Sequence, residues 1–269
     1  MIKRILTKAE QSTLATIAIC IGVMLVAGLA FAIDERTLYD VSVWMKPLKF
    51  AIALTVHLST LLVFVSLLSD GARESRLAGN ALIVASTSAL IEILYICLQA
   101  ARGRASHFNS DTVIEAFMYH VMGGAALALV GATALIGVLI LRAARSETGA
   151  CVRLGAGWGA ILGALATLIV AGAMASGLIS GPDPWIGEPG TAAAILPVVG
   201  WSRRTGDLRV SHFMATHVIQ AMALSGWLAD RWLRGSAGRL VIILTGAACL
   251  AFAAATFIQA MNGKPFIAA

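Results

Sequence analysis

Charged residues are scarce in this 269-residue chain. They make up 13% of it, against about 25% in an average soluble domain. Hydrophobic residues make up 59%, and the mean hydropathy is +0.86. This composition argues against a soluble fold and predicts an all-α, polytopic integral membrane protein. The net charge of +6 comes without a polybasic run or an aromatic-interleaved basic patch, so no nucleic-acid partner is expected.

Cysteine is also rare, and the four that occur form no C-x-x-C pair. They therefore predict neither a disulfide framework nor a zinc ribbon, and small core residues are the better interpretation. The chain also lacks a nucleotide-binding loop, a G-x-S-x-G motif and a lysine within the last apolar stretch that could hold retinal. These absences exclude the soluble enzyme classes that short motifs most readily reveal.

Seven apolar stretches are long enough to cross a bilayer, which takes about 20 residues. They are 13–33, 47–68, 80–101, 113–141, 154–180, 208–230 and 239–261. The connections leave no room for a soluble domain, so we expect a single seven-helix transmembrane domain over residues 1–269. The first stretch follows basic residues like a signal peptide, but it exceeds the ~7–15 apolar residues of a cleaved signal. We expect it to be retained as the first span.

A small majority of the 20 Lys and Arg residues would lie in the cytoplasm if the N-terminus were inside. This favours a multi-pass protein of the cell inner membrane with its N-terminus inside and its C-terminus outside. All six prolines then belong to the outer face, which also carries the longest connection, 181–207. That connection contains an apolar piece, 191–200, too short to span. A lid or a re-entrant segment is expected there, and a polar cavity is expected to open to this outer (periplasmic) face.

Within the third stretch, Ser88, Glu92, Tyr95 and Gln99 follow the spacing of one narrow helix face. Everything around them is apolar. An ionisable group at the depth of Glu92 is costly in a membrane and indicates a functional site. The alternative is a protonated Glu92 that hydrogen-bonds to a neighbouring helix.

The sixth stretch begins with the polar motif RVSHFMATHVIQ, residues 209–220. His212 and His217 lie about 140° apart around a helix, so they cannot chelate one ion together. His212 belongs near the outer face with Arg209, and His217 points deeper. Asp207 is the expected N-cap of this helix.

Three histidines share a similar depth with Glu92: His57, His120 and His217. Helix bundles build metal and haem sites from facing helices in this way, although each histidine alone is more often a helix-contact residue. His107 lies in a loop and is not included. Glu115 is explained by a capping box with Thr112.

Basic side chains surround the expected mouth of the cavity. They either anchor the protein at the membrane interface or receive an anionic small molecule or lipid headgroup. The predicted site is therefore as follows: Glu92, Asp207 and His212 as catalytic residues; Gln99, Arg102, Arg209 and Gln220 as cofactor-binding residues; His57, His120 and His217 as metal ligands.

Three functions fit this pattern. The first is a membrane enzyme or redox protein that holds a transition metal or haem b and acts on a small or lipid-like, possibly anionic substrate. The second is a proton-coupled transporter or channel with Glu92 and the histidines as relay groups. The third is a non-catalytic assembly or scaffold subunit in which the polar residues only join helices. The sequence does not decide whether the protein is an enzyme.

Overall fold

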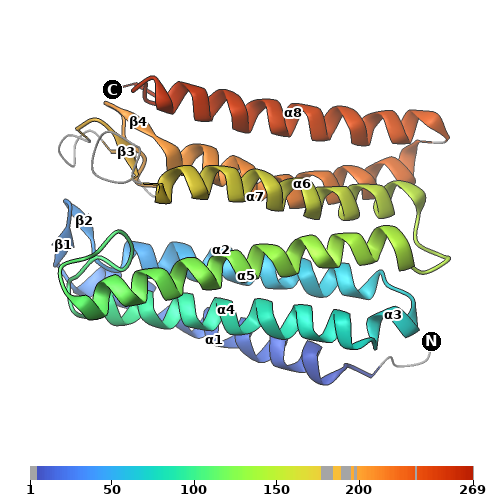
Figure 1. The fold of residues 1–269 in the computed structure, drawn as a ribbon, viewed down its shortest axis with the longest axis horizontal. Helices are drawn as coiled ribbons and strands as arrows, with labels where there is room; N and C mark the ends of the chain where they lie inside the picture. The colour runs from blue at the N-terminus through green and yellow to red at the C-terminus, as the bar shows by residue number, and fades with distance from the viewer. Residues whose placement is uncertain (1–4, 177–183, 189–194, 197–198, 234, 269) are drawn as a thin grey trace. The chain divides into compact units, whose positions relative to one another are not determined.

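A computed structural model describes residues 5–176, 184–188, 195–196, 199–233 and 235–268 (Figure 1). Helices dominate it, and the strands form two short antiparallel pairs. The helices are α1 Lys8–Ile33, α2 Met45–Ser66, α3 Asp70–Arg73, α4 Arg76–Ala101, α5 Val113–Ala143, α6 Ala150–Ala175, α7 Leu208–Trp232 and α8 Ser236–Met261. The strands are β1 Thr37–Leu38, β2 Val41–Ser42, β3 Trp185–Ile186 and β4 Gly206–Asp207.

Six of these helices are long and apolar enough to cross a membrane: α1, α2, α4, α5, α6 and α8. The prediction of an all-α, multi-pass membrane protein is confirmed to this extent. Each of the seven predicted spans coincides with a helix, but α7 is more polar than the other six. Its crossing of the membrane stays a prediction.

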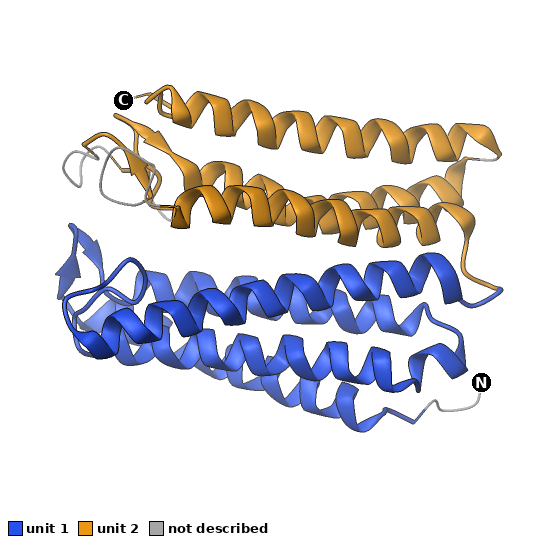
Figure 2. Ribbon diagram, viewed as in Figure 1, with its two compact units in different colours: residues 1–146 blue, residues 147–269 orange. Residues whose placement is uncertain are grey.

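The chain divides into two compact units, residues 1–146 and 147–269 (Figure 2). Unit 1 contains α1 to α5 with the β1–β2 hairpin, and unit 2 contains α6 to α8 with the β3–β4 pair. Each unit is described by itself. That the whole chain forms one domain stays a prediction.

An ion pair fastens the start of α1 in unit 1. Thr7 and Glu10 form a capping box, in which each side chain accepts a hydrogen bond from the other residue's backbone N–H. Glu10 also accepts hydrogen bonds from Arg73 Nε at 2.7 Å and Nη2 at 2.5 Å. Both side chains are only 4% exposed. The pair thus ties the beginning of α1 to α3.

Glycines let α6 and α7 approach closely in unit 2. Gly155, Gly159 and Gly163 recur every four residues on α6. A Cβ atom at Gly155 would lie 2.3 Å from the carbonyl oxygen of Met222 on α7. A Cβ at Gly159 would lie 2.9 Å from Met222 Cβ. Stripes of small residues at this spacing allow membrane helices to pack backbone to backbone.

The N-terminus of α6 is capped by a side chain from α7. Gly149, its N-cap residue, has no side chain to cap it. Instead, the Asp230 carboxylate accepts hydrogen bonds from the N–H groups of Cys151 at 3.1 Å and Val152 at 2.7 Å. A Cβ atom at Gly149 would overlap this carboxylate, at 2.0 Å from Asp230 Oδ2. Glycine is therefore the residue that this arrangement requires.

The connection before α7 is described only in part. Residues 185–186 pair with 206–207 as β3 and β4. Most of the apolar piece 191–200 lies outside the described residues, so the lid or re-entrant segment predicted in this connection stays a prediction.

Candidate functional site

Glu92 lies inside α4, one of the six apolar helices. The structure buries it together with Ser88, Tyr95 and Gln99, the polar residues predicted to share its helix face. Its own side chain is 5% exposed. This face is therefore a buried polar line within an otherwise apolar helix.

Two side chains extend this line beyond Glu92. His107 Nε2 lies 3.6 Å from Glu92 Oε2. On the other side of the imidazole, Lys46 Nζ lies 3.1 Å from His107 Nδ1. The Phe50 ring packs beside His107, with 5.8 Å between ring centroids. Lys46, His107 and Glu92 form a chain of ionisable groups, which we call the Lys46–His107–Glu92 chain.

One oxygen of Glu92 stands out in this chain. Glu92 Oε1 is buried and has no hydrogen-bond partner among the residues that the structure describes. A buried acceptor without a partner is costly, and more so when it carries charge. Such an atom marks the place where a proton or a ligand is expected to bind.

The loop between α4 and α5 brings His107 to Glu92. Gln99 Nε2 donates to the Ala105 carbonyl oxygen and to Glu115 Oε1, both at 3.1 Å. Asn109 Nδ2 donates to the same Ala105 oxygen at 2.9 Å. These bonds fold the loop back onto the end of the helices. Gln99, predicted to bind a cofactor, holds this loop.

Glu115 accepts several hydrogen bonds from charged and polar side chains around the same loop. It accepts hydrogen bonds from Arg104 Nε and Nη2 and from the Thr112 hydroxyl. Thr112 is the N-cap of α5, and its side chain accepts from the Glu115 backbone N–H, which is one half of the predicted capping box. The hydrogen bond with Glu115 holds the pKa of Arg104 above its usual value. Arg102, half-exposed, donates to Gln99 Oε1 at 2.8 Å. Its predicted role at the cavity mouth stays untested.

The predicted metal ligands are all bonded within their own units. In unit 1, His57 Nε2 lies 2.9 Å from Thr133 Oγ1 and His120 Nδ1 lies 2.7 Å from the Ala116 carbonyl oxygen. In unit 2, His217 Nδ1 lies 2.8 Å from the Phe213 carbonyl oxygen. Within the described part of the chain, no group of three or more His, Cys, Asp or Glu residues is placed to hold a metal ion. A common site for the three histidines stays a prediction.

Asp207 and Arg209 form a closed pair at the start of α7. Asp207 is the N-cap, as predicted, and it accepts from the backbone N–H groups of Arg209 and Ser202. Arg209 Nε and Nη2 also donate to the Asp207 carboxylate, at 2.9 and 2.5 Å. The Arg209 guanidinium lies 4.8 Å from the centre of the Trp185 ring. Both residues thus hold the local structure at the start of α7, and the catalytic role of Asp207 and the cofactor-binding role of Arg209 stay predictions.

His212 and Gln220 occupy the polar face of α7, partly buried. His212 Nδ1 is buried and has no hydrogen-bond partner within the described ranges. Nothing among the described contacts of unit 2 places a second ionisable side chain in hydrogen-bond contact with it, and the catalytic role of His212 stays a prediction.

His107 is the residue of the Lys46–His107–Glu92 chain that the sequence did not predict, and Lys46 belongs to the basic side chains expected around the cavity mouth. His107 lies in a loop before the start of a helix, where no helical periodicity indicates its neighbours. One feature of the sequence could have indicated this contact. His107 lies just before the predicted capping box of Thr112 and Glu115, which marks where the loop ends and the next helix begins.

The fold and this chain of ionisable groups define the protein as a multi-pass helical membrane protein with a buried carboxylate inside a span. Its sequence and its fold match no protein-family model, no curated protein and no solved structure. Its function must therefore be argued from the site.

Proposed function

We propose that this protein is a proton-coupled transporter or channel in which the Lys46–His107–Glu92 chain carries the proton. The observation that carries the proposal is the buried oxygen of Glu92 that lies beside His107 and has no hydrogen-bond partner among the described residues. Ionisable groups within membrane spans commonly belong to proton relays. Imidazole suits this role because it can accept a proton on one nitrogen while releasing one from the other.

The geometry supports one direction of proton movement. The Lys46 ammonium can only donate, so His107 Nδ1 accepts and the imidazole proton resides on Nε2, facing Glu92. In the transfer, a Lys46 N–H bond breaks as the Nδ1–H bond forms, and the Nε2–H bond breaks as Glu92 gains its proton. The two opposite charges are cancelled, which a medium of low dielectric constant favours. Glu92 then releases its proton to the opposite side, a flip of the imidazole ring returns its N–H to the side of Glu92, and Lys46 regains a proton from water.

One distance in the relay must shorten. The 3.6 Å between His107 Nε2 and Glu92 Oε2 exceeds a normal hydrogen bond of 2.7–3.2 Å. A shift of about half an ångström, or one bridging water, closes the gap. We expect this movement to control the rate of transfer.

Proton flux into liposomes tests the proposal. Purified protein is reconstituted with a pH-sensitive dye inside, and flux is driven by a pH gradient. Glu92→Gln and His107→Gln keep similar shapes but cannot relay a proton, so each should lower the flux about tenfold or more. Glu74→Gln is the matched control, because Glu74 is exposed and lies outside the spans. Undiminished flux through Glu92→Gln would remove the relay.

We also propose that α7 is a seventh span and that a polar cavity opens to the outer face of the membrane. The support is length: 25 residues extend about 37 Å, against about 30 Å of hydrocarbon. An odd number of crossings puts the two termini on opposite sides of the membrane. The small majority of Lys and Arg residues then favours an inner membrane with the N-terminus inside and the C-terminus outside. The polar face of α7 would then border the cavity.

A metal- or haem-dependent membrane enzyme is the second candidate. It is supported by the histidine hydrogen bonds: the Ala116 and Phe213 carbonyl oxygens can only accept, so His120 and His217 donate from Nδ1. This leaves Nε2 as the metal-binding atom, an orientation typical of metal ligands. Metal analysis and an absorption spectrum of the purified protein test this candidate. The absence of both bound metal and a Soret band would eliminate it.

A further inference from the structure

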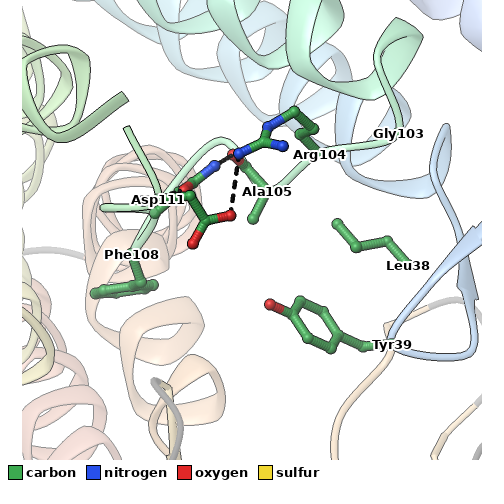
Figure 3. Close-up of a pocket in the computed structure, with 8 residues that line it drawn as sticks. Leu38, Tyr39, Gly103, Arg104, Ala105, Phe108 and Asp111 are labelled. Carbon is green, nitrogen blue, oxygen red and sulfur yellow. Dashed lines mark hydrogen bonds and ion pairs between the residues drawn. The ribbon is translucent and has the colours of Figure 1, made fainter. Parts of the chain in front are cut away.

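A small pocket lies in unit 1 between the β1–β2 hairpin and the loop that follows α4 (Figure 3). Its volume is about 170 Å³, less than the ~300–1,000 Å³ of sites for drug-sized ligands. It is lined by Leu38, Tyr39, Gly103, Arg104, Ala105, Phe108, Asn109 and Asp111. The size indicates a ligand of only a few heavy atoms.

Aromatic rings from two separate segments reach this pocket. Tyr39 stands at the tip of the hairpin and Phe108 in the loop. Figure 3 shows their rings and the Asp111 carboxylate around the same open space. Tyr39 and Phe108 both adopt positive φ angles of 53°, a conformation that glycine and asparagine adopt far more readily. Local propensity therefore does not explain an aromatic residue at either position, but a role for the rings would.

The charges around the pocket favour a cation. The Arg104 guanidinium donates two hydrogen bonds to the buried Glu115, which neutralises it. Asp111 takes only one further bond from Arg104, at 3.0 Å, and its side chain is 74% exposed. Arg102 Nη1 also lies 3.8 Å from Glu115 Oε1, so the two arginines of this loop are matched by Glu115 and Asp111. Asp111 is the acidic side chain of the pocket lining that water reaches. An incoming anion would have to displace Glu115 from Arg104.

We propose that this pocket binds a small organic cation, a quaternary or protonated ammonium group. Asp111 supplies the counter-charge, and the faces of Tyr39 and Phe108 supply cation–π contacts. The exposed position of Asp111 lets the cation enter from water.

The pocket and the proton relay share one loop. His107 reaches Glu92 in the bundle, while its neighbour Phe108 lines the pocket. A cation that moves Phe108 would also move His107 and change its distance from Glu92. The cation is then the substrate or effector of proton transport, and this part of the inference rests on the proposed function.

Calorimetric titration of the purified full-length protein tests the binding site. Choline is the probe, and 3,3-dimethylbutan-1-ol is its neutral analogue of nearly the same shape. We expect choline to bind at least about tenfold more tightly than the alcohol. Asp111→Asn should weaken choline binding about tenfold or more. Asp40→Asn is the matched control, because Asp40 is exposed on the same hairpin but does not line the pocket.

Replacing the aromatic residues with asparagine distinguishes the contribution of the rings to binding from that of the backbone conformation. Tyr39→Asn and Phe108→Asn keep a residue that tolerates positive φ, so the turns should persist while choline affinity falls. Equal affinity for choline and the alcohol, no choline binding at all, or binding of phosphate in place of choline would each overturn the proposal. Glu92→Gln should still bind choline. If Glu92→Gln does not lower the proton flux while choline still binds, the relay is rejected and the cation-binding site stands.

Discussion

Glu10 and Arg73 carry opposite charges in a place where almost no water reaches them. Removing one partner leaves the other charge buried and unpaired, which is far more costly than removing both. Arg73→Met should therefore lower the free energy of unfolding by about 3–5 kcal/mol. The double variant Glu10→Gln with Arg73→Met should lose less. Thermal unfolding in detergent measures both. Equal losses would show that the charge pairing contributes little.

Asp34, directly after α1, gives a residue-scale prediction on pH. Its hydrogen bond with the Arg36 guanidinium, and another from the Trp44 indole N–H, hold the pKa of Asp34 well below its usual range. A lowered pKa stabilises the folded hairpin at every pH above the normal value of about 3.9, and that stabilisation is lost only as pH falls through the lowered value. Hairpin amides should thus show equal hydrogen-exchange protection at pH 5 and 7.

A variant gives the control for this expectation. Asp34→Asn cannot carry the charge at any pH, so its hairpin should be less protected at both values. Protection that falls between pH 7 and 5 in the unmodified protein would mean that another group governs the hairpin.

At the residue scale, the sequence predicts contacts that follow helical periodicity and does not predict contacts made by loop residues. The buried face of Ser88, Glu92, Tyr95 and Gln99 follows from helical spacing. The contact between His107 and Glu92 does not, because a loop residue reaches a helix through hydrogen bonds that have no fixed spacing. Asp207 and Arg209 are two positions apart, so their ion pair is a local contact that closeness in sequence allows.

At the scale of the element, the close contact of α6 with α7 depends on glycine. Leucine at Gly159 would force its side chain against Met222, so Gly159→Leu should destabilise the protein by about 2–3 kcal/mol. Gly172 lies on the same helix with nothing near it. Gly172→Leu should be neutral or slightly stabilising, since leucine favours helix more than glycine does. Unfolding of both variants in detergent checks this, and similar losses would show that packing does not depend on the glycine stripe.

Element positions follow well from the sequence, because apolar runs of membrane length are strong signals. Every predicted span coincides with a helix. The short α3 was not predicted, since four residues between two spans leave no periodic pattern. The glycine stripe of α6 was visible in the sequence, but its partner helix was not, because spacing gives a packing face without saying what covers it.

At the scale of the whole molecule, the crossing of α7 decides the topology. Arg204 and Arg231 are both exposed and lie near opposite ends of this helix. If α7 crosses the membrane, Arg204→Cys should react with a membrane-impermeant thiol reagent added outside intact cells. Arg231→Cys should react only after the membrane is opened. Labelling of both from one side would show that α7 does not cross.

The division into two units could not be read from the sequence. Hydrophobic runs show which segments enter the membrane, but the choice of neighbours among apolar helices depends on small residues and single hydrogen bonds. His57 with Thr133, and Ser211 with the Ala253 carbonyl, are bonds of this kind.

The carboxylate that caps α6 belongs to Asp230, about 80 positions later in the chain. During synthesis, α6 therefore leaves the ribosome with its first amide groups unpaired, and they stay so until α7 has followed. We expect the two helices to become stable as a hairpin and not one after the other. A ribosome stalled before Asp230 should hold an α6 that proteases still reach, and translation past that codon should protect it.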